Sequence, residues 1–247
     1  MKESIWVGFD GREAPAFAVA VHSIKSRLSR QIPVNGIVLA DLQECGLYRR
    51  PTESFINSEG HRQLIDVLSR REGYDGAMST EFALSRFLTP HLAGSGWALF
   101  MDCDMMARTD LSKLFALRDP SKAVMCVKHN YAPVVTVKMD GQPQTKYSRK
   151  NWSSVMMFNC DHPANRRLTV EMVNTMPGRD LHAFCWLDDA DIGDLPLEWN
   201  WLASESEFIA NPMIVHHTLG SPCLPGYEDA PYGNEWRREL QDWAVRP

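Results

Sequence analysis

A short apolar stretch that ends in two acidic residues most constrains what this chain can fold into. Residues 97–101 are all apolar and are followed at once by Asp102, Cys103 and Asp104. Such a run predicts a short, fully buried strand. Side chains alternate along a strand, so Asp102 and Asp104 are expected to point the same way. Two neighbouring carboxylates repel unless a cation lies between them, which favours a divalent metal site. The alternative is that Asp102 caps a turn and Asp104 is solvated.

The order of the remaining segments favours one α/β domain over residues 1–247. Predicted strands cover 5–9, 34–40, 97–101, 123–127, 154–159 and 212–215, and predicted helices cover 14–30, 79–88, 111–117, 165–176 and 181–186. Strands that alternate with helices indicate an open sheet whose ligands bind at the carboxyl ends of its strands. Residues 41–71 carry no clear pattern. The length and the lack of a linker favour a single unit.

Composition excludes some classes of protein. The net charge of -5 argues against a nucleic-acid binder driven by overall charge, and no apolar run is long enough for a signal peptide or a membrane span. We therefore expect a cytoplasmic protein. The six cysteines form no Cys-x-x-Cys pair, and we expect them to be reduced and structural.

The turn after the first strand has two possible functions. Phe9, Asp10, Gly11 and Arg12 connect this strand to a helix, in the arrangement of a nucleotide-binding corner. The alternative is local: Asp10 is the helix N-cap, and Glu13 completes a capping box.

Arg86 is the unusual residue of the helix predicted from an N-cap at Ser79. It lies among apolar residues, and a buried guanidinium needs an anionic partner. That partner could be a bound ligand or a nearby aspartate.

A basic and aromatic segment interrupts the strand and helix pattern. Asp140-Gly141 between two extended segments predicts an inserted β-hairpin over residues 134–147. Basic residues surround it, with aromatic residues interleaved: Lys128, Lys138, Lys146, Arg149, Lys150, Tyr131, Tyr147 and Trp152. The patch could hold a sugar or phosphate-bearing acceptor, or it could be a solvated face.

Further candidates lie near the end of the chain. Asp188, Asp189 and Asp191 form a second acidic cluster, and His216 and His217 end the last predicted strand. A regular strand allows only one of these histidines to face a metal. In the tail, apolar residues fall on one helical face that we expect to dock on the domain, with peripheral membrane contact as the less favoured alternative: Trp236, Leu240, Trp243 and Ala244.

In their order, these signals resemble the metal-dependent GT-A glycosyltransferases, nearest to the retaining glycosyltransferase family 8 branch that contains glycogenin and the lipooligosaccharide galactosyltransferases. The resemblance covers residues 5–223. Its most specific parts are the helix with Arg86, Leu99-Phe100-Met101-Asp102-Cys103-Asp104, the strand ending at Asn159, the acidic cluster and His216-His217-Thr218-Leu219-Gly220. It implies a Rossmann-like GT-A fold with a mixed, mostly parallel sheet, flanking helices and the inserted β-hairpin.

The resemblance also implies roles for single residues. Asp102, Asp104 and His216 would bind Mn²⁺ or Mg²⁺, and Asp188, Asp189 and Arg86 would be catalytic. The nucleotide-sugar donor, with a UDP-sugar favoured, would contact Phe9, Asp10, Gly11, Arg12, Arg86, Asp102, Cys103 and Gly220. The acceptor would be a glycan or another hydroxyl compound. The chain departs from the family pattern at Trp152-Ser153-Ser154, at Asp189 and at His-His-Thr-Leu-Gly.

Two other functions stay open from the sequence. A sugar-1-phosphate nucleotidyltransferase could use the same sheet and Asp pair, although Gly11-Arg12 is a thin version of the glycine- and arginine-rich loop expected there. A carbohydrate-binding protein without catalysis could also have this fold.

Overall fold

The computed structural model describes residues 1–57, 62–74, 76–130 and 149–245. The strands are β1 (Glu3–Gly8), β2 (Val34–Ile37), β3 (Thr52–Ile56), β4 (Arg62–Asp66), β5 (Ala77–Met78), β6 (Trp97–Met101), β7 (Met105–Ala107), β8 (Val124–Cys126), β9 (Val155–Asn159), β10 (Ile192–Asp194), β11 (Trp201–Leu202) and β12 (Ile214–His216). The α-helices are α1 (Ala14–Lys25), α2 (Leu39–Glu44), α3 (Val67–Arg71), α4 (Thr89–Ala93), α5 (Ser112–Phe115), α6 (Val170–Thr175), α7 (Gly178–His182) and α8 (Gly233–Val245). Short 3₁₀ helices include η1 (Gly11–Glu13), η2 (Ser85–Leu88), η4 (Trp152–Ser154), η6 (Asp189–Asp191) and η7 (Leu197–Asn200).

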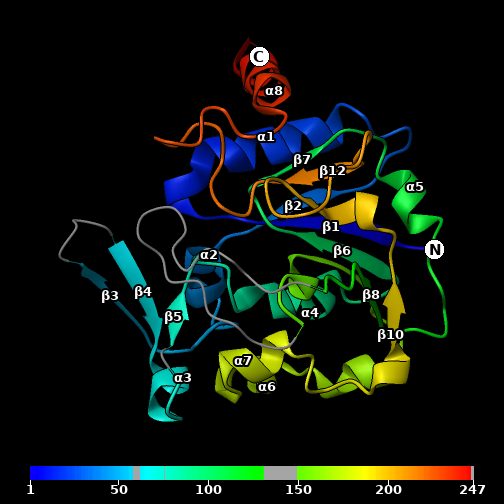
Figure 1. Ribbon diagram of the computed structural model, residues 1–247. Helices are drawn as coiled ribbons and strands as arrows, with labels where there is room; N and C mark the ends of the chain where they lie inside the picture. The colour runs from blue at the N-terminus through cyan, green and yellow to red at the C-terminus, as the bar shows by residue number, and fades with distance from the viewer. Residues whose placement is uncertain (58–61, 75, 131–148, 246–247) are drawn as a thin grey trace.

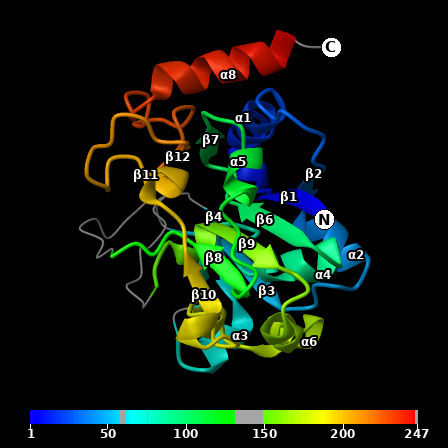
Figure 2. The same ribbon diagram turned by 90° about the vertical axis from the view of Figure 1, so that its right-hand side faces the viewer.

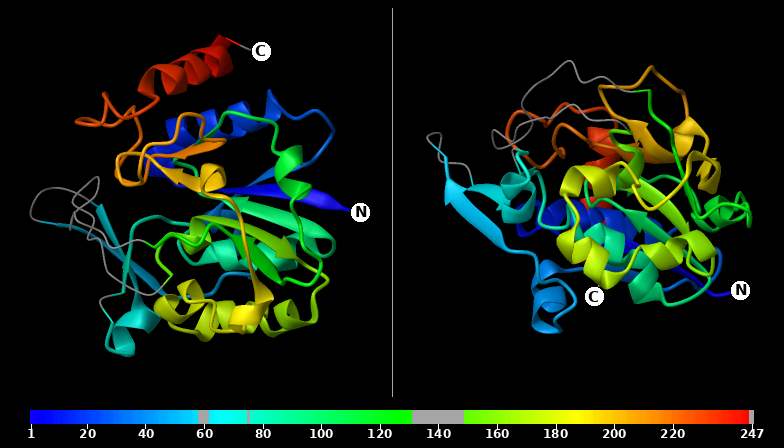
Figure 3. Two further views of the ribbon diagram at one scale, coloured as in Figure 1. Left: turned by 45° about the vertical axis from the view of Figure 1, so that its right-hand side comes forward. Right: turned by 90° about the horizontal axis from the view of Figure 1, so that it is seen from below.

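A six-stranded sheet in the order β10-β8-β9-β6-β1-β2 forms the centre of the molecule. β1 is parallel to β2 and β6, and β10 is parallel to β8, whereas β9 runs antiparallel to β6 and β8. α1 covers one face of this sheet, and α4, α6 and α7 lie on the other (Figures 1 and 3). The mixed, mostly parallel α/β architecture that the sequence predicts is therefore confirmed.

β6 lies in the middle of the core because it is apolar at every position. None of its five side chains is more than 2% exposed. This burial is what a strand covered on both faces requires, and it explains why the run has no polar alternation. The run ends where the sheet ends, so Asp102 is the first residue able to reach a polar environment.

Two small sheets extend this framework. β7 pairs antiparallel with β12, and β11 pairs parallel with β12, which brings residues 201–216 onto the segment that follows β6. The second small sheet, β3-β4-β5, projects to one side of the domain (Figure 1). β3 and β4 lie within the stretch for which the sequence showed no pattern, and β5 follows it.

α8 lies across α1 on the outside of the molecule (Figure 2). Trp236 is 1% exposed and Leu240 packs on the same cluster, so the expected docking face exists. Trp243 does not belong to it, because this side chain is 50% exposed. None of the described helices has both the length and the apolar character that crossing a membrane would need.

Several predicted elements differ from the structure. The first helix ends at Lys25 rather than residue 30, and the second strand ends at Ile37 rather than residue 40. The α-helix predicted over 79–88 is wrong, because residues 79–84 form bends and turns and residues 85–88 form the short 3₁₀ helix η2. The predicted hairpin, residues 134–147, lies entirely outside the described residues.

Candidate functional site

Three side chains from two distant parts of the chain converge beyond the carboxyl end of β6. Asp102 and Asp104 follow β6, and His216 is the last residue of β12. One ligand atom of each lies within 4.8 Å of the others. β12 reaches this point because it pairs with β7, where His216 is opposite Met105. The structure thus brings together the three residues that the resemblance assigns to the metal, and their role as ligands stays a prediction.

The chemistry of this group fits a divalent cation. Nε2 of His216 lies 3.2 Å from Oδ1 of Asp104, and both side chains are largely buried. Two lone-pair atoms that face each other at this distance repel unless a proton or a cation lies between them. Two carboxylates and one imidazole suit Mn²⁺ or Mg²⁺, without selecting one of the two.

Arg86 is the buried partner of Asp102. Its Nη1 lies 2.7 Å from Oδ1 of Asp102, and its Nε donates to the carbonyl of Ala83. The guanidinium also lies over the rings of Phe82 and Phe100, at 5.2 and 5.0 Å from their centroids. The local alternative from the sequence, an ion pair with a nearby aspartate, is therefore correct. Contact between Arg86 and a donor phosphate remains a prediction.

A buried carboxyl group that the sequence analysis did not place in the site lies behind Asp104. Glu13 is 2% exposed, and the thiol of Cys103 donates to its Oε2 at 3.5 Å. Burial, together with the negative charges of Asp104 and Asp10, raises the pKa of Glu13 well above its usual value. The predicted capping box misassigned this residue, because its carboxyl group faces Cys103.

The N-terminal corner is tied together by Asp10. This carboxylate is fully buried, and it accepts from the backbone N–H of Arg12 at 2.9 Å and of Glu81 at 3.0 Å. Nη2 of Arg12 also forms an ion pair with Oδ2 of Asp10, at 2.7 Å. Burial alone would raise the pKa of Asp10, but the bonds and charge of Arg12 lower it below its ordinary value. Phe9 packs edge-on against Phe17, with ring centroids 5.1 Å apart.

Gly11 is the exposed residue of this corner. A Cβ atom built there would have no neighbour within 4 Å. Cys103, by contrast, is fully buried and faces Glu13, so of these two predicted donor contacts only Gly11 is open to a ligand.

Asp188 and Asp189 do not join the cation group. Both side chains are exposed at the start of η6, where Asp189 pairs with Arg149. In the register of the large sheet, Ile192 is level with Ala98, at the amino end of β6. The backbone of the acidic cluster thus lies at the amino end of the edge strand β10, while the side chain of Asp189 reaches Arg149, in the segment that leads into β9. The catalytic role of Asp188 and Asp189 stays a prediction.

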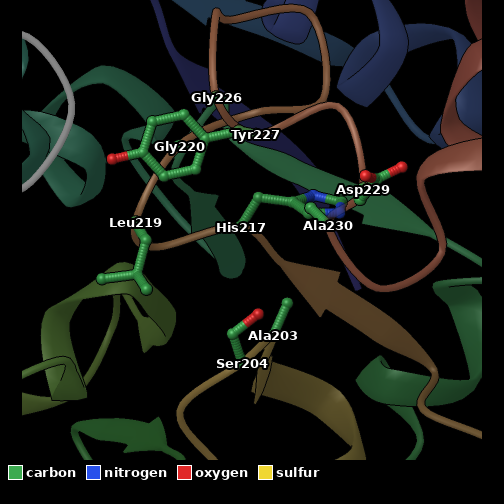
Figure 4. A pocket seen from close by; sticks show the side chains of 9 residues that line it. All are labelled: Ala203, Ser204, His217, Leu219, Gly220, Gly226, Tyr227, Asp229 and Ala230. Atoms are coloured by element: carbon green, nitrogen blue, oxygen red, sulfur yellow. The ribbon is translucent and has the colours of Figure 1, made fainter.

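His217 faces a different space from His216. Its Nε2 donates to the carbonyl of Pro231 at 3.0 Å, and its backbone N–H donates to the carbonyl of Asp104 at 2.9 Å. Burial lowers the pKa of His217. Figure 4 shows this side chain at a cavity of about 250 Å³. The cavity is lined by Ala203, Ser204, His217, Leu219, Gly220, Gly226, Tyr227, Asp229 and Ala230.

Gly220 allows the wall of this cavity to close. A Cβ atom at Gly220 would lie 2.7 Å from the ring of Tyr227, so the close approach requires glycine. The contact of Gly220 with the nucleotide-sugar donor stays a prediction, because its packing against Tyr227 does not test it.

The described members of the basic segment are not a solvated run of charges. Lys128 and Arg149 lie over the ring of Trp152, at 5.9 and 5.5 Å from its centroid, and Lys150 is buried. The other basic residues of this segment, Lys138 and Lys146, lie outside the described residues.

Solved structures with the same fold are glycosyltransferases. The chain is similar to the bifunctional glycosyltransferase WbbM (TM-score 0.60, 14% identity, 97% of this chain and 49% of WbbM) and therefore spans about half of that protein. It is also similar to the galactosyltransferase LgtC in complex with donor and acceptor sugar analogues, with a TM-score of 0.56 and 12% identity over 99% of this chain and 97% of LgtC. A third similar structure is mouse xyloside xylosyltransferase 1, with a TM-score of 0.55 and 11% identity over 90% of this chain and 99% of that protein. The similarity of these structures shows that the chain has the GT-A fold. At identities this low it shows the fold alone.

No protein-family model matches the chain. A relative in Arabidopsis thaliana, Protein CDI, is 40% identical over 245 residues, which cover 97% of this chain and 86% of the relative. This chain therefore belongs to the same protein family as Protein CDI of Arabidopsis thaliana.

Proposed function

We propose that the chain is a glycosyltransferase that moves a sugar from a nucleotide-sugar, with a UDP-sugar as the favoured donor, to a hydroxyl group of a glycan or another acceptor. The observation that carries this proposal is the convergence of Asp102, Asp104 and His216 beyond β6, within a GT-A fold. Both the metal and the retaining course, as in the branch that the sequence resembles, are part of the proposal.

The proposed roles are metal binding, orientation of a metal ligand and binding of the nucleoside. Asp102, Asp104 and His216 would hold Mn²⁺ or Mg²⁺, which as a Lewis acid stabilises the growing charge on a leaving diphosphate. Arg86 balances the charge of Asp102 and orients its carboxylate through their 2.7 Å contact. The turn at Gly11 and Arg12 is open at the surface and would receive the nucleoside part of the donor.

Catalysis also needs a group near the reacting sugar carbon, where an oxocarbenium-like state develops. The resemblance assigns this role to Asp188 and Asp189, and it is the part of the proposal that the geometry supports least. If Asp188→Asn and Asp189→Asn keep full activity, the group comes from another residue.

The remaining parts of the proposal concern the whole chain. We propose that residues 1–247 act as one catalytic domain and that the basic segment with Lys146, Arg149 and Lys150 contacts the acceptor. A cytoplasmic location stays a prediction from the sequence.

A donor screen tests the function. Purified protein with Mn²⁺ is mixed with individual nucleotide-sugars, and the released nucleotide is identified. A glycosyltransferase releases a nucleoside diphosphate, whereas a nucleotidyltransferase working in reverse with pyrophosphate forms a nucleoside triphosphate. The true donor at about one hundred times its Kd should also stabilise the fold by roughly 2.7 kcal/mol.

Matched variants connect turnover to the site. Asp104→Asn should abolish metal-dependent release, and Asp242→Asn, on the exposed side of α8, should leave it unchanged. If no donor is turned over or bound with either metal, the chain is not a nucleotide-sugar enzyme.

A further inference from the structure

A line of buried hydrogen bonds runs from a backbone carbonyl to His216. The carbonyl of Asn151 accepts from Oγ of Ser154 at 2.7 Å, and Oγ of Ser154 accepts from Nδ2 of Asn200 at 2.8 Å. Oδ1 of Asn200 then meets Nδ1 of His216 at 2.9 Å. We propose that Asn200 is a positioning residue that holds His216 as the Nδ1–H tautomer, with the lone pair of Nε2 turned toward Asp104.

The carbonyl of Asn151 determines which atom donates and which accepts in each of these hydrogen bonds. A backbone carbonyl can only accept, so the hydroxyl hydrogen of Ser154 is committed to Asn151. Oγ of Ser154 is then left as an acceptor, which requires the nitrogen of the Asn200 amide on that side. The same nitrogen also reaches the carbonyl of Asn151 at 3.4 Å. The amide oxygen therefore faces His216, and Nδ1 must carry the hydrogen.

Burial makes this arrangement costly to lose. Asn200 is fully buried, and Ser154 and His216 are each 3% exposed. A buried polar atom without a partner costs about 1–3 kcal/mol, so water cannot easily replace the amide. Asn200 ends η7 directly before β11, and β11 pairs with β12 with Leu202 opposite His216. The pairing of the small sheet therefore sets the distance between Asn200 and the imidazole.

The other tautomer would compete with a cation. With the hydrogen on Nε2, His216 could donate to Oδ1 of Asp104, which is only 3.2 Å away. One hydrogen bond would then occupy two of the three ligand atoms. Asn200 opposes this by stabilising the hydrogen on the opposite side of the ring. The repulsion that then remains between Nε2 of His216 and Oδ1 of Asp104 in the metal-free protein is relieved when a cation binds between them. Partners that orient a metal-binding imidazole typically change metal affinity by 10–100-fold.

This inference rests on the proposed function for its cation, but the tautomer exists without one. Two measurements are therefore made on the full chain. Two-bond nitrogen–proton NMR couplings of the imidazoles, in protein treated with chelator, identify the tautomer of His216, which is assigned by its loss in His216→Gln. Electron paramagnetic resonance of free Mn²⁺ measures the affinity for the metal.

Three variants separate position from packing. Asn200→Ala removes the acceptor and should shift His216 toward Nε2–H and weaken Mn²⁺ binding by about 10–100-fold. Asn200→Asp keeps an oxygen toward Nδ1, and the hydroxyl of Ser154 can turn to donate to the new carboxylate. This variant should keep the Nδ1–H tautomer and bind Mn²⁺ no more weakly than wild type. Ser154→Ala is the packing control, because the carbonyl of Asn151 can still accept from the Asn200 nitrogen. This variant should keep the Nδ1–H tautomer and the affinity for Mn²⁺.

The outcomes are distinct. An Nε2–H tautomer in the wild-type protein overturns the inference, as does equal loss of Mn²⁺ affinity in Asn200→Ala and Asn200→Asp. The wild-type spectrum decides the tautomer even if Asn200→Ala does not fold. A wild-type protein that binds no Mn²⁺ would instead contradict the metal in the proposed function.

Discussion

Arg86 and Asp102 form a largely buried ion pair, with Nη1 of the arginine 2.7 Å from Oδ1 of the aspartate. Asp104 is in a different electrostatic setting, because it lies beside His216 and its charge acts on the buried carboxyl group of Glu13. In the metal-free protein, Asp102 should therefore stabilise the fold, whereas Asp104 should destabilise it or leave its stability unchanged. One balances a buried cation, and the other adds negative charge to a cluster that is already acidic.

The first prediction follows from this difference. From the sequence alone, both aspartates should be removable without loss of stability, since each deletion relieves repulsion. With the structure, Asp102→Asn is expected to destabilise the metal-free protein by about 3 kcal/mol, because it removes one charge of a largely buried ion pair and leaves Arg86 without its counter-charge. Asp104→Asn should be neutral or stabilising. Urea unfolding in the presence of chelator measures both, and equal effects would contradict the assigned pairing.

Glu13 provides a second prediction, with a defined pH dependence. Its pKa is raised in the fold by burial and by Asp104 and Asp10. Stability from such a group is fully present below the unfolded pKa and is lost as pH rises through the folded pKa. Glu13→Gln removes this loss of stability at high pH, and the new amide oxygen can still accept a hydrogen bond from the thiol of Cys103. We expect the variant to be more stable than wild type at pH 7–8 and to lose that advantage near pH 4.

The comparison is made by chemical unfolding in chelator at each pH. Gln43→Glu, on the exposed side of α2, is the control for an added carboxylate without burial. A stability difference between wild type and Glu13→Gln that does not change with pH would mean that Glu13 is ionised throughout.

Local patterns explain which parts of the fold were predictable. β6 and its two aspartates are read from consecutive residues, since an apolar run that ends in carboxylates has few alternatives in a folded protein. The helix expected over 79–88 fails for a tertiary reason. Asp10 accepts from the N–H of Glu81, and Arg12 donates to the carbonyl of Ser79, so distant side chains hold this backbone in turns.

Other differences have a similar origin. β3 is short and mostly exposed, so its sequence shows no apolar alternation, and its pairing with β4 is not visible locally. Glu13 was assigned to a capping box because that pattern needs only four residues. Its actual neighbour, Cys103, is 90 residues away in the chain, and no local rule connects them. The roles of Asp188 and Asp189 are assigned by resemblance, and no local pattern indicates that Asp189 pairs with Arg149, 40 residues earlier in the chain.

The third prediction concerns the attachment of α8. Glu239 is 7% exposed, pairs with Arg27 and meets Nδ1 of His22 at 2.9 Å. Burial alone would raise the pKa of Glu239, but Arg27 and then His22 lower it below its ordinary value. Stability from a lowered carboxylate pKa is present above the unfolded pKa and is lost as pH falls through the folded one.

Glu239→Gln should therefore destabilise the protein at pH 7, and the difference from wild type should shrink below pH 4.5. Hydrogen exchange of α8 and urea unfolding at pH 3–7 measure this. Asp242→Asn, on the exposed side of the same helix, should behave as wild type at every pH. A constant deficit in Glu239→Gln would indicate lost packing rather than lost charge.

The last prediction uses two glycines in opposite environments: Gly8, the last residue of β1, and Gly11, in the turn that follows. A Cβ atom at Gly8 would lie 2.4 Å from the ring of Phe82, whereas at Gly11 it would meet nothing within 4 Å. Gly8→Ala should cost about 1–3 kcal/mol, as overpacking does, and Gly11→Ala should change stability by less than about 0.5 kcal/mol. Thermal unfolding without ligand tests this pair. If the nucleotide packs on this turn, Gly11→Ala should still weaken UDP binding in calorimetry, because the added methyl group occupies the surface that the nucleoside would contact. Unchanged UDP affinity in Gly11→Ala would place the nucleotide elsewhere, while the stability difference between the two variants would still hold.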